Sequence, residues 1–151
     1  MSTRALLTAL ALATIVLAAR AETGTTSVPD FVPRQEWSIK SASPTTAKVI
    51  IGRVETWEQS KIIVHVSIID IPIPQGLPGA GAMTRIDHVP FDKAALAASA
   101  DRLLSNNVPP PPGFESGYEQ WKSAKGGVFT TTVEKAIEIV FQAQPHQHNG
   151  R

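Results

Sequence analysis

The stretch "VIIGRVETWEQSKIIVHVSII", residues 49–69, contains two β-branched runs separated by a short polar segment. Side chains branched at Cβ favour extended backbone, because they pack well on a pleated surface. Residues 49–57 and 61–71 are therefore predicted strands, and residues 58–60 are a predicted loop. The pattern predicts an antiparallel hairpin at the centre of the fold.

The hydrophobic pattern also predicts the register of this hairpin. The expected pairs are Trp57–Lys61, Thr56–Ile62, Val54–Val64, Gly52–Val66 and Ile50–Ile68. This pairing gathers an almost wholly apolar face, and the opposite face mixes charged, polar and apolar side chains. A slip by one residue would turn Trp57, Glu55 and Arg53 onto the apolar face and lose burial.

Helical periodicity follows the hairpin. Asp92 can cap a helix that extends to Leu104, because apolar side chains repeat there every three or four residues. Ser116 and Thr131 are each followed three residues later by a glutamate, which is a capping-box spacing. Two further helices are therefore predicted, the second ending near Phe141.

Two more segments complete the predicted fold. Residues 83–89 are a third candidate strand, and Pro109–Pro112 is a stiff connector in polyproline II conformation. The fold class is α+β, with a small antiparallel sheet built on the central hairpin and about three helices packed on its apolar face.

The ends of the chain differ in composition from its middle. Arg4, an apolar run and the small residues at 19 and 21 predict a secretory signal peptide over residues 1–21. Residues 22–46 are rich in Pro, Ser and Thr and predict a flexible tail, although the alternation at 36–40 also allows a short strand. A single domain is expected over 47–143 and a disordered tail over 144–151.

Charge and composition exclude several partners. Cleavage removes Arg4 and Arg20, so Lys and Arg fall from 14 to 12 against 13 Asp and Glu, and the expected mature charge is −1. Such a chain has no cluster of basic residues that would bind nucleic acid, and no stable membrane insertion is expected after cleavage. An exported chain without cysteine must be held together by its core alone.

Lys125, Gly126 and Gly127 pose a choice between a phosphate-binding loop and a helix end. A phosphate loop follows a strand and precedes a helix, whereas these glycines follow a predicted helix and precede a short strand. Gly126 is therefore the predicted left-handed residue just past the helix end.

Five side chains are the candidates for binding: His88, Tyr118, Trp121, His65 and Arg53. Tyr118 and Trp121 share a helix face because they lie three residues apart, and His65 opposes Arg53 in the predicted hairpin. The structural alternative is that the histidines are half-buried sheet residues and that both rings complete the core against Leu103 and Phe141.

No motif for catalysis is visible. The chain has no cysteine and no nucleophile-elbow serine, and the histidine pair His146 and His148 lacks a third ligand. No catalytic residue, metal or cofactor is therefore expected.

Three short motifs carry a resemblance: "HVPF" at 88–91, "GYEQW" at 117–121 and "GGVFTTTVEKAIE" at 126–138. Together they are similar to a pattern in short exported bacterial proteins of uncharacterised activity, over roughly residues 49–141. The resemblance implies a small standalone domain and assigns no catalytic residue.

Two classes of function fit these features. The first is a non-enzymatic protein of the periplasm or cell exterior that binds another envelope protein or a peptide, as an inhibitor or immunity factor does. The alternative is a small-molecule binding module or a hydrolase centred on His88. A closed pocket at His88 favours the alternative, and an open aromatic surface favours the first.

The exported protein is expected to begin at Glu22, because the small residues that precede it fit the cleavage site. Intact mass spectrometry of the protein from an envelope fraction checks this. A mass that retains residues 1–21 would contradict it.

Overall fold

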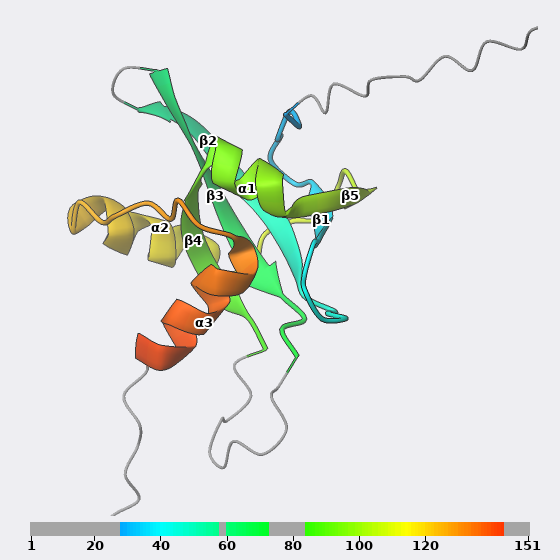
Figure 1. Ribbon diagram of the computed structural model, residues 1–151. Coiled ribbons are helices and arrows are strands. Elements are labelled where there is room, and N and C mark those ends of the chain that lie inside the picture. The colour runs from blue at the N-terminus through cyan, green and yellow to red at the C-terminus, as the bar shows by residue number, and fades with distance from the viewer. Residues whose placement is uncertain (1–27, 58–59, 73–83, 144–151) are drawn as a thin grey trace, which may run out of the picture.

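The computed structural model describes residues 28–57, 60–72 and 84–143 (Figure 1). The predicted signal peptide and the predicted C-terminal tail lie outside these residues. The described elements are β1 (Glu36–Ile39), β2 (Lys48–Trp57), β3 (Lys61–Ile69), β4 (Ile86–Asp92), α1 (Lys93–Ser99), β5 (Ala100–Ser105), α2 (Phe114–Ser123) and α3 (Val133–Ala143). The strands form one antiparallel sheet in the order β4-β3-β2-β1-β5. The predicted α+β class and the central hairpin of β2 and β3 are confirmed.

The register of the hairpin is confirmed in its first half and wrong in its second. Trp57 pairs with Lys61 and Val54 with Val64, as predicted, but Ile51 takes the place opposite Val66. Gly52 is the extra residue of a β-bulge between the Ile51 and Arg53 pairs.

The bulge is favoured because it places the apolar residues before Gly52 on the core face of the sheet. With one residue added, Ile51 and Val49 share a face with Val66, and all three are 0% exposed. A straight ladder would have turned Ile51 to the opposite face.

The two faces of the sheet carry different helices. Val66 and Val89 lie in the main apolar core with Leu96 of α1 and Val133 of α3. The opposite face is covered by α2, which lies apart from α1 and α3 at the left of Figure 1. The expectation that all helices pack on one face is therefore corrected. Isoleucines at 50 and 63 leave the second face apolar enough to hold α2.

Strand β1 lies inside the segment predicted as a tail. It pairs with β2 on one side and β5 on the other, so the fold begins before residue 47. Trp37 packs edge-on against Phe31, with ring centroids 5.6 Å apart, and its Nε1 donates to Gln35 Oε1 at 3.0 Å. The alternation at 36–40 was the correct signal, and the Ser, Thr and Pro around it obscured it.

The helix predicted from Asp92 is shorter than expected. The Asp92 carboxylate accepts from the backbone N–H of Ala94 at 2.9 Å, so the cap is confirmed. The helix ends at Ser99, and the segment from Ala100 becomes β5 because β1 offers it a strand edge. The third strand, predicted at residues 83–89, is β4 at Ile86–Asp92.

The other helix ends differ by a few residues. Helix α2 begins at Phe114 after Gly113, so Ser116 is not its cap. Thr132, not Thr131, caps α3 by accepting from the Lys135 N–H at 3.3 Å. Residues 109–112 form a connector without helix or strand, as expected.

The residue in left-handed conformation after α2 is Lys125, with φ of 50°, so its assignment to Gly126 was wrong. Gly126 is required for another reason. A Cβ there would lie 2.3 Å from Cδ1 of Trp121, so the glycine lets the chain return across the indole.

Within the residues described, no helix is both long enough and apolar enough to cross a membrane.

Replacing Gly52 with alanine should destabilise the protein by about 1–3 kcal/mol, the usual cost of overpacking. An ideal Cβ at Gly52 would lie 2.2 Å from Cζ of Phe114. The free energy of unfolding from denaturant titration measures the effect. Gly127→Ala is the control, because a Cβ there meets nothing within 4 Å. Equal stability of the two variants would contradict this account.

Candidate functional site

The structure brings all five predicted binding residues together. Arg53 comes from β2, His65 from β3 and His88 from β4, and α2 contributes Tyr118 and Trp121. The helix can approach because Gly117 rests on His88: a Cβ at Gly117 would lie 2.6 Å from the His88 Cβ.

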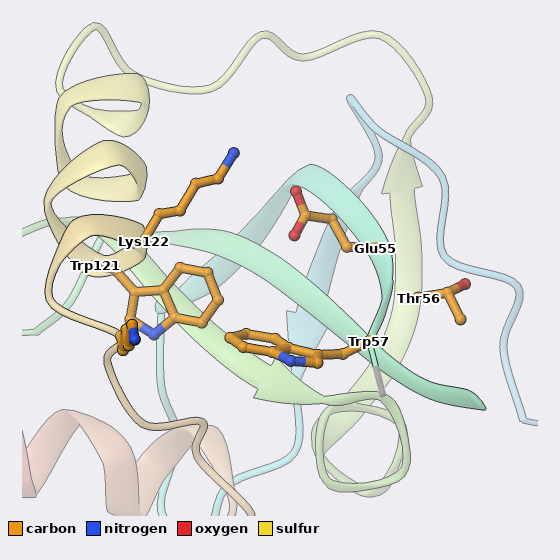
Figure 2. Close-up of a pocket in the computed structure, with 6 residues that line it drawn as sticks. Glu55, Thr56, Trp57, Trp121 and Lys122 are labelled. Carbon is orange, nitrogen blue, oxygen red and sulfur yellow. The ribbon is translucent and has the colours of Figure 1, made fainter. Parts of the chain in front are cut away.

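A hollow of about 360 Å³ opens at one end of this cluster (Figure 2). It is lined by Glu55, Thr56, Trp57, Trp121, Lys122 and Lys125. The two indoles meet edge to face, with centroids 5.1 Å apart and planes at 85°. Trp57 is 39% exposed and Trp121 is half-buried, so a ligand in the hollow would touch both rings.

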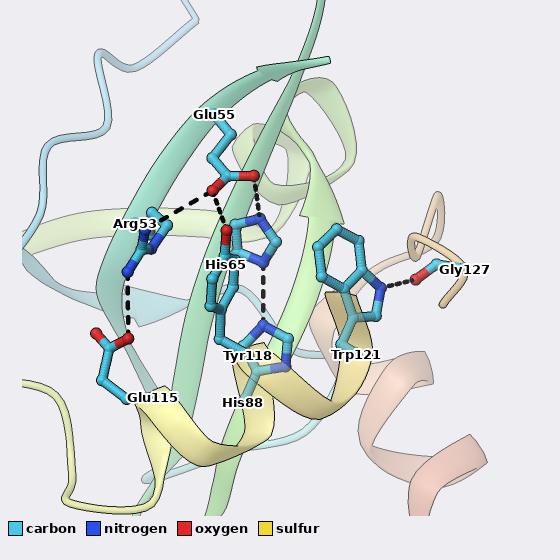
Figure 3. A network of polar contacts seen from close by, with 8 residues as sticks. All are labelled: Arg53, Glu55, His65, His88, Glu115, Tyr118, Trp121 and Gly127. Carbon is cyan, nitrogen blue, oxygen red and sulfur yellow. Dashed lines mark hydrogen bonds and ion pairs between the residues drawn. The ribbon is translucent and has the colours of Figure 1, made fainter. Parts of the chain in front are cut away.

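Trp121 is the fixed wall of the hollow. Its Nε1 donates to the carbonyl of Gly127 at 2.9 Å (Figure 3). The His65 ring lies behind it, with centroids 4.7 Å apart. The indole is thus held in one orientation before any ligand arrives.

Two imidazoles form the centre of the cluster beneath α2. His65 is 0% exposed, and its Nδ1 lies 3.0 Å from Nε2 of His88. The rings stack with centroids 5.2 Å apart. Burial lowers the pKa of His65, and burial together with the neighbouring His65 lowers the pKa of His88 to about 4. Both imidazoles are therefore neutral at pH 7.

Glu55 determines which nitrogen of His65 carries the proton. Its Oε1 accepts from the Tyr118 hydroxyl, and its Oε2 lies 3.7 Å from His65 Nε2, beyond hydrogen-bond length. His65 Nε2 is buried without a hydrogen-bond partner among the described residues. A carboxylate facing this nitrogen favours a proton on it, so His65 Nδ1 accepts and His88 Nε2 donates.

Arg53 closes the cluster toward solvent. Its guanidinium carbon lies 4.1 Å from the centroid of the Tyr118 ring, and Nη2 lies 3.1 Å from Glu115 Oε2. Nη1 lies 3.9 Å from Glu55 Oε1. The hydrogen bond to Glu55, followed by burial, raises the pKa of Tyr118, so the phenol stays protonated.

The exposure of the predicted rings differs between them. Tyr118 is 2% exposed and supports the site from within, so a partner would reach Trp121 but not Tyr118. The alternative that both rings complete the core against Leu103 and Phe141 was wrong in these contacts. Leu103 is exposed on β5, and Phe141 packs against the main core.

Sequence reasoning missed the carboxylates and the outer wall of the hollow. Glu55 and Trp57 alternate with Arg53 along β2, so the register already placed all three on one face. Lys122 was not among the candidates, and Lys125 was considered only as part of a phosphate-binding loop or a helix end. Glu115 carried no usable signal, because the start of α2 was misplaced.

The chemistry available to the cluster is limited. Ser67 is buried on β3 two residues after His65, but its hydroxyl donates to the Asp87 carbonyl at 2.6 Å. No hydroxyl among the described residues is hydrogen-bonded to His65 or His88, and that of Tyr118 donates to Glu55 instead. The same residues contain no group of three His, Asp or Glu side chains that could hold a metal ion.

Comparison with known proteins finds no matching family model, no matching curated protein and no matching solved structure. The resemblance to short exported bacterial proteins therefore stays a prediction.

The buried histidine pair predicts an acid-sensitive stability. A histidine whose folded pKa is lowered takes up its proton more readily when unfolded, so its stabilising effect is complete above pH 6.5. That effect is lost progressively as pH falls from 6.5 to about 4, the pKa of His88.

The measurement is the free energy of unfolding against pH for the wild type and His88→Gln. The wild type should lose about 1 kcal/mol more per pH unit over this window than the variant, because each such group contributes at most about 1.4 kcal/mol per unit. Subtracting the profile of the variant from that of the wild type cancels the contribution of the carboxylates, which titrate in both proteins. Parallel profiles would contradict the prediction.

Proposed function

We propose that this protein is an exported, non-enzymatic binding protein that contacts a peptide or protein partner of the cell envelope through the Trp57–Trp121 hollow. The observation that carries the proposal is the pair of indoles at the mouth of the hollow, one from the end of β2 and one from α2. Tryptophan offers a large contact area at little cost in side-chain entropy, which is why it is common at binding hot spots.

The buried cluster supports this role by holding the surface rigid. Tyr118 and His65 pack against Trp121, the Glu55 carboxylate accepts from the Tyr118 hydroxyl, and the Gly127 carbonyl accepts from the indole nitrogen of Trp121. A wall that is already ordered loses little freedom when a partner binds.

The alternative, a hydrolase centred on His88, has less support. His88 packs under Gly117 and against Phe114, and its pKa of about 4 makes it a weak base at neutral pH. The hollow is lined by Glu55 and not by either histidine. A small-molecule ligand fits the hollow better than a substrate of His88 does.

Trp57→Ala should lose the partner while it keeps the fold, because Trp57 is 39% exposed at the end of its strand. Immobilised mature protein is exposed to an envelope extract, and captured proteins are identified by mass spectrometry. Each identified partner is then purified, and its affinity is measured by calorimetry. The affinity should fall on the order of tenfold or more, as for an aromatic hot spot.

Leu104→Ala is the matched control, because Leu104 is also 39% exposed but lies on β5. Equal affinity of wild type, Trp57→Ala and Leu104→Ala would remove the hollow from the interface and overturn the proposal.

A further inference from the structure

The hollow carries more positive than negative charge, and its two lysines are not ion-paired with any described residue. Lys122 and Lys125 line it, both are exposed, and no ion pair joins either to another described residue. Lys122 Nζ lies 5.5 Å from the Tyr118 ring centroid, so its ammonium is turned toward the cluster and not away from it.

The acidic residue in the lining does not neutralise these lysines. One oxygen of Glu55 accepts from the Tyr118 hydroxyl and faces Arg53, and the other faces His65. Figure 3 shows this carboxylate directed toward the buried cluster. Neither ammonium group is ion-paired among the described residues, so both can pair with an anionic ligand.

Apolar surface lies beside this charge. The edge of one indole meets the face of the other at 85° (Figure 2), which leaves an angled aromatic wall in the hollow that Lys122 and Lys125 also line. A hollow of about 360 Å³ is at the lower end of the size of ligand pockets. It suits one or two side chains of a peptide and is too small for a folded element.

We infer that the ligand of the hollow is an acidic peptide segment, in which a carboxylate lies near Lys122 and Lys125 and a neighbouring aromatic side chain packs against Trp57 and Trp121. The inference rests on the proposed function and specifies the chemistry of the partner. Carboxylate paired with lysine fixes the orientation of the segment, and the ring contact supplies its buried area.

The probes are N-acetyl-Asp-Phe-amide and its uncharged isostere N-acetyl-Asn-Phe-amide. Binding is followed by NMR through the indole Nε1–H signals of Trp57 and Trp121. The aspartyl peptide should shift both signals and bind at least about fivefold more tightly than the asparaginyl peptide at low salt. This preference should vanish near 1 M salt, where the screening length is about 3 Å.

Variants locate the charge that is responsible. In Lys122→Gln/Lys125→Gln the ratio of the two affinities should fall to about one, as expected when the ion pairs are removed. Lys135→Gln is the control and should keep the wild-type ratio, because Lys135 lies on α3 and pairs with Glu138 at 2.6 Å.

The outcomes separate this inference from the proposed function. If the asparaginyl peptide binds as tightly as the aspartyl peptide while the captured partner still depends on Trp57, the inference fails and the proposed function stands. If partner affinity is independent of Trp57, both fail. Lysine-dependent binding to phosphatidylglycerol vesicles, with no response to either peptide, would also overturn the inference, because it would assign the charge to a membrane surface.

Discussion

The ring of Phe114 rests on the backbone of β2 at Gly52, and the two sides of the sheet depend on this contact. A side chain of any size at Gly52 would occupy the place of the ring. The β-bulge at Gly52 also returns Ile51 to the main core. Gly52 therefore admits the Phe114 ring on one face of the sheet and allows Ile51 to be buried on the other. Without the bulge, either the core would lose an isoleucine or α2 would be lifted from the sheet.

The binding cluster follows from that docking of α2. Once Phe114 is seated, the next turns of the helix place Tyr118 over Arg53 and Trp121 beside His65. Two neutral imidazoles under a helix are an unusual filling for a small domain, since burial opposes their protonation and one nitrogen has no partner among the residues described. The cluster gives a rigid base to the pair formed by Trp57 and Trp121.

Much of the fold could be predicted from periodicity alone. The hairpin, the cap at Asp92 and the shared face of Arg53 and His65 were all visible in the sequence. The convergence of the five candidate residues follows from that shared face and from the helix face of Tyr118.

The errors arose where distant contacts override local preference. The segment after Ser99 has helical periodicity, but it becomes β5 because β1 offers an unpaired edge. The bulge at Gly52 depends on Phe114, which lies 62 positions later, so local alternation could not reveal it. Trp57, Lys122 and Lys125 were missed because the hollow forms only where the end of β2 meets the end of α2.

The position of β1 has a consequence for how the chain becomes folded. Ser38 on β1 bonds to Arg102 of β5, 64 residues further along, whereas β2 and β3 are joined by a short hairpin. Because synthesis begins at the N-terminus, β1 can pair with the hairpin early, but its other edge stays unpaired until β5 at Ala100–Ser105 has been made. An open strand edge is a site of aggregation, and contacts distant in sequence form slowly. The early part of the molecule therefore has the most to gain from a chaperone during its synthesis, and closure of the sheet by β5 is a late step.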